Sequence, residues 1–468
     1  MGQTTATANL PAGKLPFLTK LVFGLGDWGN TTTSTIFGFF FAFFLNNVAL
    51  LEPLYAAPVL LAGGVWDAIN DPLIGVLGDR VRTRWGRRRP FFLFGAVPFM
   101  ITFIMLWWVP PWESQIAKAL YYAFWYILWD TAFTFVAVPY TALTPELTED
   151  YDERTRLNGY RMAVSMLGGL IAALSVPIFS DLIPDRKSAY LVMGSIFGIL
   201  AGLPYFLLFF KIRERFTTTT VSNLNLFSGF RYTWRNRAFR FAAGIYLTAW
   251  VTISLVSSLL QYYITYYLNS PGQLDILLGL VQGCTLICIP VMVWMSGKWG
   301  KNRAYMLGIT TLIIVMVNLA LLPANGINIA FILAACAGLG IAAAHVIPWS
   351  IIPDVIEIDE LETGRRQEGT YYGFLVFLQK SGSAFTLAFV QWVFANTGFI
   401  PNEAQNPETL SAIRWLIGGL PALLLIGSIV LAWRYPITRK RHAELREALA
   451  EKRDSRKITK PVANTPVE

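Results

Sequence analysis

The sequence predicts an all-α membrane protein with twelve transmembrane helices in two pseudo-symmetric six-helix halves. Of its 468 residues, 54% are hydrophobic and only 14% are charged, whereas a soluble chain carries about a quarter charged residues. The mean hydropathy of +0.48 is also typical of a membrane protein. Apolar runs long enough to cross a bilayer recur along the whole chain, and basic residues collect in alternate connections between them.

A helix needs about 20 predominantly apolar residues to cross a hydrocarbon core of roughly 30 Å. The twelve segments that meet this criterion are 20–46, 54–78, 90–110, 117–144, 160–182, 188–210, 240–268, 275–297, 303–323, 326–352, 369–396 and 411–433. The connections at 80–89, 211–240 and 298–303 and the segment from 434 onward are basic or highly charged, while most others are short or weakly charged. The positive-inside rule therefore predicts that both termini are cytoplasmic.

The longest internal connection divides the chain into its two halves. We expect a cytoplasmic N-terminus at 1–19, an N-terminal six-helix half at 20–210, a cytoplasmic linker at 211–239, a C-terminal six-helix half at 240–433 and a cytoplasmic tail at 434–468. A short repeat supports related halves, because Trp85-Gly86 follows the second span and Trp299-Gly300 follows the eighth. Six-helix repeats with a substrate site between them are one known transporter plan.

The composition argues against several other functions. The net charge of +9 reflects loop arginines and lysines on one side of the membrane, so we expect no nucleic-acid partner. With three cysteines and two histidines, the chain offers no zinc or haem spacing, and we expect no cofactor. A membrane enzyme would need a nucleophile–base pair or a metal cluster, and a sensor would need a signalling domain. We find neither, so we expect a protein that is not an enzyme.

Two carboxylates interrupt the apolar run of the second span. Asp67 and Asp71 lie four residues apart, so on a helix they share one face. Bare carboxylates at bilayer depth repel each other and lose hydration, so they persist only with a cation, a proton or a basic partner. Hard cations take oxygen ligands, which the two carboxylates and Asn70 can supply. The pattern favours ion-coupled transport.

Two further polar residues lie in apolar spans. Lys380 is in an otherwise uncharged span and should face a cavity with an anionic partner. It could neutralise the carboxylates when the cation leaves, or it could form a purely structural salt bridge with Asp67. His345 could be a hydrogen-bonded core residue, or it could be a substrate contact or proton relay.

Motifs along residues 20–430 resemble the glycoside–pentoside–hexuronide:cation symporters, the melibiose permease-like family of the major facilitator superfamily. The segments that carry the resemblance are Phe23-Gly24-Leu25-Gly26, Trp66-Asp67-Ala68-Ile69-Asn70-Asp71-Pro72, Trp85-Gly86, Tyr126-Ile127-Leu128-Trp129-Asp130, Arg154 with Arg161, Pro353-Asp354, and Gln379-Lys380-Ser381-Gly382.

The resemblance implies roles for individual residues. It implies cation ligands at Asp67 and Asp71, a sugar-binding carboxylate at Asp130 and a lysine facing the cation site at Lys380. We also expect Asn70 to contribute to the cation site, and Thr31, Asp27, Tyr126 and Arg161 to contribute to the substrate site. The chain departs from melibiose permease where Thr31 replaces a sugar-binding acid, Thr134 replaces a tryptophan that stacks on sugar, and Gly64 replaces an arginine. Trp129, Trp349 and Tyr262 could stack on a sugar instead, or could simply pack.

The loop after the second span also resembles a superfamily motif. The motif is Gly75-Val76-Leu77-Gly78-Asp79-Arg80, followed by further arginines that include Arg87. The resemblance implies a gating role for Asp79, Arg80 and Arg87, because Asp79 can form ion pairs with arginines and accept hydrogen bonds from the N–H groups at a helix end. The alternative is a positively charged anchor on the cytoplasmic side.

These observations together predict cation-coupled symport, driven by Na⁺ or H⁺, of a small sugar, glycoside or sugar acid by alternating access. The main alternative is a lysophospholipid symporter of the same fold. We expect a monomer in the lipid bilayer of the inner (plasma) membrane, with a small-molecule substrate and no bound metal beyond the coupling cation.

Overall fold

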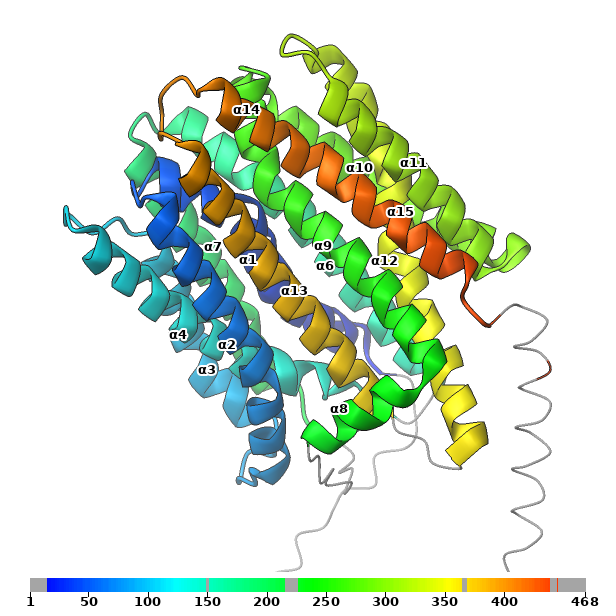
Figure 1. Ribbon diagram of the computed structural model, residues 1–468. Coiled ribbons are helices and arrows are strands. Elements are labelled where there is room, and N and C mark those ends of the chain that lie inside the picture. The colour runs from blue at the N-terminus through cyan, green and yellow to red at the C-terminus, as the bar shows by residue number, and fades with distance from the viewer. Residues whose placement is uncertain (1–14, 149–150, 215–225, 364–367, 438–443, 445–468) are drawn as a thin grey trace, which may run out of the picture. The chain divides into compact units, whose positions relative to one another are not determined.

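The computed structural model describes residues 15–148, 151–214, 226–363, 368–437 and 444, and the regular elements of this part of the chain are helices (Figure 1). The first six long helices are α1 (Phe17–Asn47), α2 (Pro53–Arg80), α3 (Arg89–Leu106), α4 (Gln115–Thr141), α6 (Tyr151–Leu182) and α7 (Arg186–Lys211). The later ones are α9 (Arg237–Tyr262), α10 (Leu274–Trp299), α11 (Lys301–Leu321), α12 (Ile327–Thr363), α13 (Glu368–Thr397) and α15 (Leu420–Trp433). The short elements are α5 (Thr144–Leu147), α8 (Leu226–Arg235), α14 (Pro407–Arg414), the π-helices η1 (Tyr263–Tyr267) and η3 (Trp415–Gly419), and the 3₁₀-helix η2 (Pro271–Gln273).

The twelve predicted spans are confirmed as helices, and most boundaries lie within four residues of the prediction. The exceptions are α6, which begins nine residues earlier than predicted, and α12, which ends eleven residues later. Among the described residues, ten helical segments are long and apolar enough to cross a membrane. α1 and α4 are less apolar because α1 carries Asp27, Asn30 and the hydroxyl run at 31–35, and α4 carries Lys118 and Asp130. Polar residues within spanning helices mark functional positions by default.

The contacts divide the chain into two compact units. The first comprises Met1–Phe37, Ile69–Trp112 and Leu120–Val221. Within it, α7 packs closely on α3 through glycines spaced four residues apart. A Cβ on Gly194 would lie 2.5 Å from the Trp107 ring, and a Cβ on Gly198 would lie 3.0 Å from Ile104. Small residues at this spacing let helix backbones approach each other, which is how helices associate in lipid.

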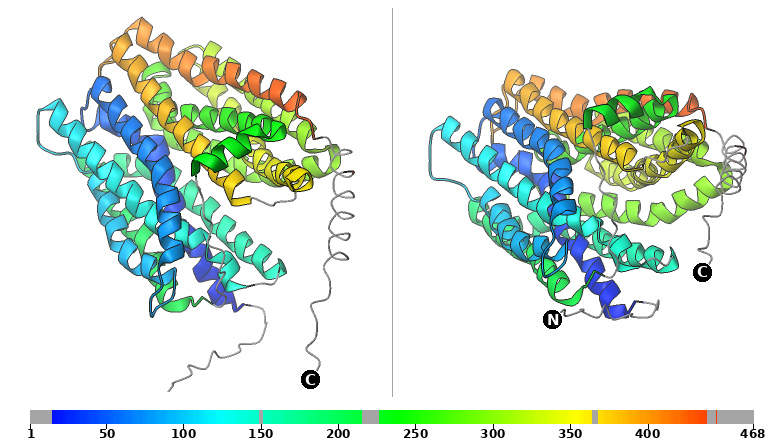
Figure 2. Two further views of the ribbon diagram at one scale, coloured as in Figure 1. Left: turned by 60° about the horizontal axis from the view of Figure 1, so that its bottom comes forward. Right: turned by 90° about the horizontal axis from the view of Figure 1, so that it is seen from below.

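The second unit comprises Gly38–Ala68, Glu113–Ala119 and Ser222–Glu468. In it, α9 lies beside α13 and α15 (Figures 1 and 2). Its core contains the fully buried rings of Phe239, Tyr246, Tyr305 and Tyr371. This unit also includes the end of α1 and the beginning of α2, which belong to the predicted N-terminal half. The boundaries of the predicted halves remain a prediction.

Candidate functional site

The motif with the two carboxylates lies within one continuous helix, α2, so Asp67 and Asp71 are one turn apart as predicted. The boundary between the compact units falls between Ala68 and Ile69. Asp67 therefore belongs to the second unit and Asp71 to the first, and each has its own partners.

In the first unit, two neighbouring residues of α2 bond to α4. The Thr134 hydroxyl donates to Asp71 Oδ1 at 3.0 Å. The Asn70 amide donates to Asp130 Oδ2 at 3.2 Å and to the Asp130 carbonyl oxygen at 3.3 Å. Asn70, Asp130 and Thr134 are all buried. Asn70, a predicted cation ligand, is thus bonded directly to Asp130, the predicted substrate-binding acid. Asp71, the other cation ligand here, is bonded to Thr134, one turn further along α4.

Thr134 is a site residue that sequence reasoning missed. The sequence showed only that a stacking tryptophan was absent at this position. The structure shows a hydroxyl that donates to Asp71, and the same hydroxyl oxygen could coordinate a hard cation. The four-residue spacing between Asp130 and Thr134, equal to one helical turn, was the available signal.

In the second unit, Lys380 of α13 forms an ion pair with Asp67 of α2. The side chains are only partly exposed, at 19% and 23%. The two helices approach closely one turn away, where a Cβ on Gly64 would collide with the side chain of Ala384. Gly64 therefore lets α2 approach α13 closely, one turn from this pair. Lys380 has the anionic partner that we expected.

The predicted substrate residues of α1 contact α6 within the first unit. Arg161 Nε lies 3.8 Å from Asp27 Oδ2. Although it is buried, this nitrogen has no hydrogen-bond partner in the described part of the chain. Thr31 and Ser165 share a hydrogen bond of 2.6 Å between their hydroxyl oxygens. This polar cluster combines a guanidinium, a carboxylate and hydroxyls, which can recognise a polar solute.

The aromatic candidates occupy different environments. Tyr126 and Trp129 are buried and pack on Phe37, with ring centroids 4.7 and 4.8 Å from its ring. Trp349 is 38% exposed and stacks on Tyr372, so it retains a free surface that the other two lack.

Tyr262 is fully buried. His345 makes an edge-on ring contact with Trp250 at 5.1 Å. The possible roles of His345 and Trp349 in binding remain predictions.

The loop between α2 and α3 is held by an acid that lies three residues after the end of α7. Glu214 accepts backbone N–H bonds from Arg87 at 2.8 Å, Arg88 at 2.7 Å and Arg89 at 3.3 Å. These amides precede or begin α3, where the helix dipole favours an anion. The side chains of Asp79 and Arg80 lie outside the described residues. The gating role of these two residues and Arg87 remains a prediction.

The glycines of the repeat seen in the sequence share one backbone feature. Gly86 and Gly300 both have positive φ, at 109° and 88°, which favours glycine. The side-chain contacts differ between the two loops. A Cβ on Gly86 would lie 2.6 Å from Glu214, whereas the space around Gly300 is open. In the second loop, Lys301 instead binds the carboxylate of Asp354 at 2.7 Å.

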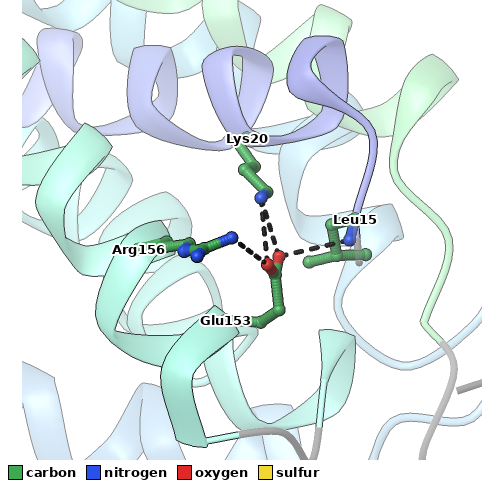
Figure 3. A network of polar contacts seen from close by, with 4 residues as sticks. All are labelled: Leu15, Lys20, Glu153 and Arg156. Carbon is green, nitrogen blue, oxygen red and sulfur yellow. Dashed lines mark hydrogen bonds and ion pairs between the residues drawn. The ribbon is translucent and has the colours of Figure 1, made fainter. Parts of the chain in front are cut away.

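A second acid missed by sequence reasoning joins α1 to α6 (Figure 3). The carboxylate of Glu153 accepts from Lys20 Nζ at 2.8 Å, from the backbone N–H of Leu15 at 3.2 Å and from Arg156 at 3.1 Å. The hydrogen bond from Lys20 is the main reason that the pKa of the Glu153 carboxyl lies below its usual value. This network holds the beginning of α1 against the beginning of α6.

Comparisons with known proteins place the chain in a family. The family model described as "MFS/sugar transport protein" matches residues 22–439. The chain belongs to this family. It is a transporter of the major facilitator superfamily rather than an enzyme, as predicted.

The chain is similar over nearly its whole length to several curated proteins. An uncharacterized symporter from Synechocystis is 33% identical, with 96% of this chain and 99% of that protein covered. The glucuronide carrier protein homolog of Escherichia coli is 28% identical, with 92% and 95% covered. The sodium-dependent lysophosphatidylcholine symporter 1 of Gallus gallus is 26% identical, with 94% and 90% covered.

Solved structures support the fold alone. The nucleoside transporter NupG matches with a TM-score of 0.62 at 12% identity, covering 89% of this chain and 99% of NupG. The peptide transporter POT in complex with sulfate matches with a TM-score of 0.66 at 13% identity, covering 92% and 97%. The predicted fold class is therefore confirmed.

Proposed function

We propose that this protein is a cation-coupled symporter of a small polyhydroxylated solute, namely a sugar, glycoside or sugar acid. The pair of bonds between α2 and α4 carries the proposal. Asn70 bonds to Asp130, and the adjacent Asp71 bonds to Thr134, one turn further along α4. A cation that binds Asp71 competes for that carboxylate and shifts this part of α2, and Asn70 transmits the shift to Asp130.

This arrangement supplies the coupling that symport requires. Each ligand must bind more tightly when the other is present, and the coupling free energy is reciprocal. The carboxylate of Asp130 can accept from two neighbouring hydroxyls of a solute, and Arg161 can bind a carboxylate or a further hydroxyl. Charge-assisted bonds of this kind are stronger than bonds between neutral groups.

Lys380 completes the proposed cycle. An unpaired buried charge is strongly unfavourable. Because Lys380 forms an ion pair with Asp67, the carboxylate of Asp67 keeps a positive partner when no cation is bound. Na⁺ is the coupling ion we propose first, because several relatives are named as sodium-dependent symporters. H⁺ remains the alternative. We place the protein in the plasma membrane with both termini cytoplasmic, since the basic loops define that side.

The relatives named as lysophosphatidylcholine symporters favour a second candidate, the cation-coupled uptake of a lysophospholipid. In that case Arg161 would bind the phosphate and Asp130 would contact only the polar head. The two candidates differ in what determines affinity, which is hydroxyl groups for a sugar and acyl-chain length for a lysolipid.

Uptake into proteoliposomes tests the proposal. Purified protein is assayed with labelled glycosides, glucuronides and lysophosphatidylcholine, each with a Na⁺ gradient, an H⁺ gradient or neither. We expect accumulation of a polyhydroxylated solute only with a cation gradient. Asp71→Asn should abolish accumulation, whereas the matched change Asp181→Asn, at an exposed end of α6, should leave it intact.

The other outcomes are equally informative. Accumulation of lysophosphatidylcholine alone would replace the sugar assignment by the second candidate. Uptake that ignores both gradients, or that survives Asp71→Asn, would contradict cation coupling at this site.

A further inference from the structure

Polar residues form a clasp at one end of the second unit. We call Asn46, Asn47, Tyr262, Tyr266 and Asn402 the outer clasp. The Tyr262 hydroxyl bonds to Asn46 Oδ1 at 2.5 Å, and the Tyr266 hydroxyl donates to Asn47 Oδ1. The Asn402 amide donates to the Asn47 carbonyl oxygen at 2.8 Å, and its backbone N–H donates to the Tyr266 hydroxyl at 2.9 Å.

The outer clasp joins helices from the two predicted halves. Asn46 and Asn47 end α1, whereas Tyr262 ends α9 and Tyr266 lies in η1. α1, α9 and α13 are the first, seventh and eleventh spans, so all three end on the same face of the membrane. Because the connections there are weakly charged, the positive-inside rule makes this the outer face. The clasp therefore closes the halves where solute would enter from outside.

The clasp lies among packed aromatic rings at the end of α9. Tyr262 is fully buried and packs against Phe43 and Phe394, each with a ring centroid 5.0 Å away. The α-helix changes to a π-helix at Tyr263, immediately after Tyr262. A π-helical turn is rare, so its presence at the end of this span marks an unusual backbone beside the clasp.

A second feature opposes closure. Gln391 of α13 is completely buried, and neither atom of its amide has a hydrogen-bond partner in the described part of the chain. It lies 7 residues after Ala384 and 11 after Lys380, which is close to two and three full turns. Gln391 therefore shares the face of α13 that meets α2.

The opposing surface is apolar. α2 and α13 run antiparallel, because Asp67 pairs with Lys380 while Gly64 meets Ala384. Continuing this register places Gln391 level with Ala56, which cannot hydrogen-bond through its side chain. An amide buried without a partner is unfavourable, and it would regain hydrogen bonds if water entered.

We propose that the outer clasp and Gln391 form a balanced outer gate. The clasp bonds hold the outer ends of the halves together, while the unpaired amide of Gln391 destabilises the closed arrangement and favours its opening. The opposition keeps the free-energy difference between closed and open states small, so that ligand binding can shift it. This gate depends on the fold and not on which solute the protein carries.

Distance measurements between spin labels test the gate without any transport assay. Labels are placed on cysteines at Glu113 and Glu403, both exposed in outer loops, after Cys284, Cys288 and Cys336 are replaced by alanine. The full-length protein is reconstituted in lipid nanodiscs. Tyr266→Phe keeps the ring and removes both clasp bonds of its hydroxyl, to Asn47 and from the Asn402 backbone N–H. We expect the ratio of long to short distances to rise about thirtyfold, which corresponds to roughly 2 kcal/mol for two neutral hydrogen bonds.

The neighbouring tyrosines provide matched controls. Tyr263 and Tyr267 donate to the carbonyl oxygens of Leu319 and Leu322, at 2.8 and 2.6 Å, within the predicted C-terminal half. Tyr263→Phe and Tyr267→Phe should leave the distance distribution unchanged, although they remove bonds of the same kind.

Gln391→Leu should act in the opposite direction to Tyr266→Phe. It removes the unpaired amide, so the long-distance population should fall and solute-free protein should become more closed. An open population that is unchanged by Tyr266→Phe and Tyr262→Phe, or that rises equally in the Tyr267→Phe control, would overturn the clasp. An open population that grows in Gln391→Leu would overturn the opposing role of the amide.

Discussion

Removing the carboxylate of Glu214 should release the loop between α2 and α3. This acid accepts from three successive backbone amides, those of Arg87, Arg88 and Arg89, at the beginning of α3. A side-chain cap at a helix N-terminus contributes roughly 0.5–2 kcal/mol. A negative charge there contributes about 0.3–1 kcal/mol more when exposed, and up to about 2 when partly buried. For Glu214→Ala we therefore expect a loss of about 2–3 kcal/mol in the local stability of this loop.

The neutral variant should cost less than full removal of the side chain. In Glu214→Gln one oxygen can still accept from the loop, but the other becomes an NH₂ group that cannot accept, and the charge is lost, so we expect a loss of about 1–2 kcal/mol. Gly86→Ala should also weaken the loop. An alanine there would have to adopt φ of 109° and would place its Cβ 2.6 Å from the carboxylate of Glu214.

Amide hydrogen exchange of the peptide that covers residues 84–92 measures this loss directly. A loss of 2–3 kcal/mol corresponds to local opening that is roughly 30 to 150 times more frequent. The segment 299–303, where Gly300 also has positive φ but lies in open space, is an internal control and should be unaffected. Exchange in residues 84–92 that stays slow in Glu214→Ala, or that accelerates equally in both loops, would refute this account.

The remaining predictions concern the transport site, its scaffold and its orientation. Lys380→Ala should impair net uptake far more than solute exchange, because net uptake requires the empty carrier to return without a cation, when its carboxylates need Lys380 as a partner. Equal losses in parallel assays of net uptake and counterflow would argue against Lys380 as the partner of the empty carrier. Asp130→Asn should weaken solute binding by roughly 1.5–3 kcal/mol in calorimetry, the contribution of hydrogen bonds to a charged group, and leave cation affinity measured without solute nearly unchanged. Because the pKa of Glu153 is lowered, its stabilisation is present above the usual pKa of a carboxyl and is lost as the pH falls through the lowered value. The stability advantage of the wild type over Glu153→Gln, measured by thermal unfolding in detergent, should therefore vanish in acid, and an advantage that persists there would contradict it. Single cysteines at Arg87 and Arg303 should react with membrane-impermeant reagents only in inverted vesicles, because both residues belong to the basic side. Labelling of either residue from outside intact cells would contradict the twelve-span orientation and would also reverse the side assigned to the outer clasp.

Much of the candidate site could be located from the sequence because charge is costly in lipid. Asp67, Asp71, Asp130 and Lys380 stand out in apolar spans, and such residues persist there only with a function or a partner. Their partners were less predictable. Thr134 and Glu214 are ordinary residues in the sequence, and only the packing of α4 and α7 brings them to Asp71 and to the loop before α3.

By itself, the sequence determined the twelve helical spans, the family and the motif on α2, because span length, loop charge and local spacing are properties of neighbouring residues. The tertiary structure alone decided which groups meet. Asp67 pairs with Lys380, 313 residues away, Asn70 with Asp130, and Asn47 with Tyr266. It also left the amide of Gln391 buried without a partner among the described residues. The physical reason is that such contacts depend on where helices cross and how closely small residues such as Gly64 let them approach, which no local pattern encodes.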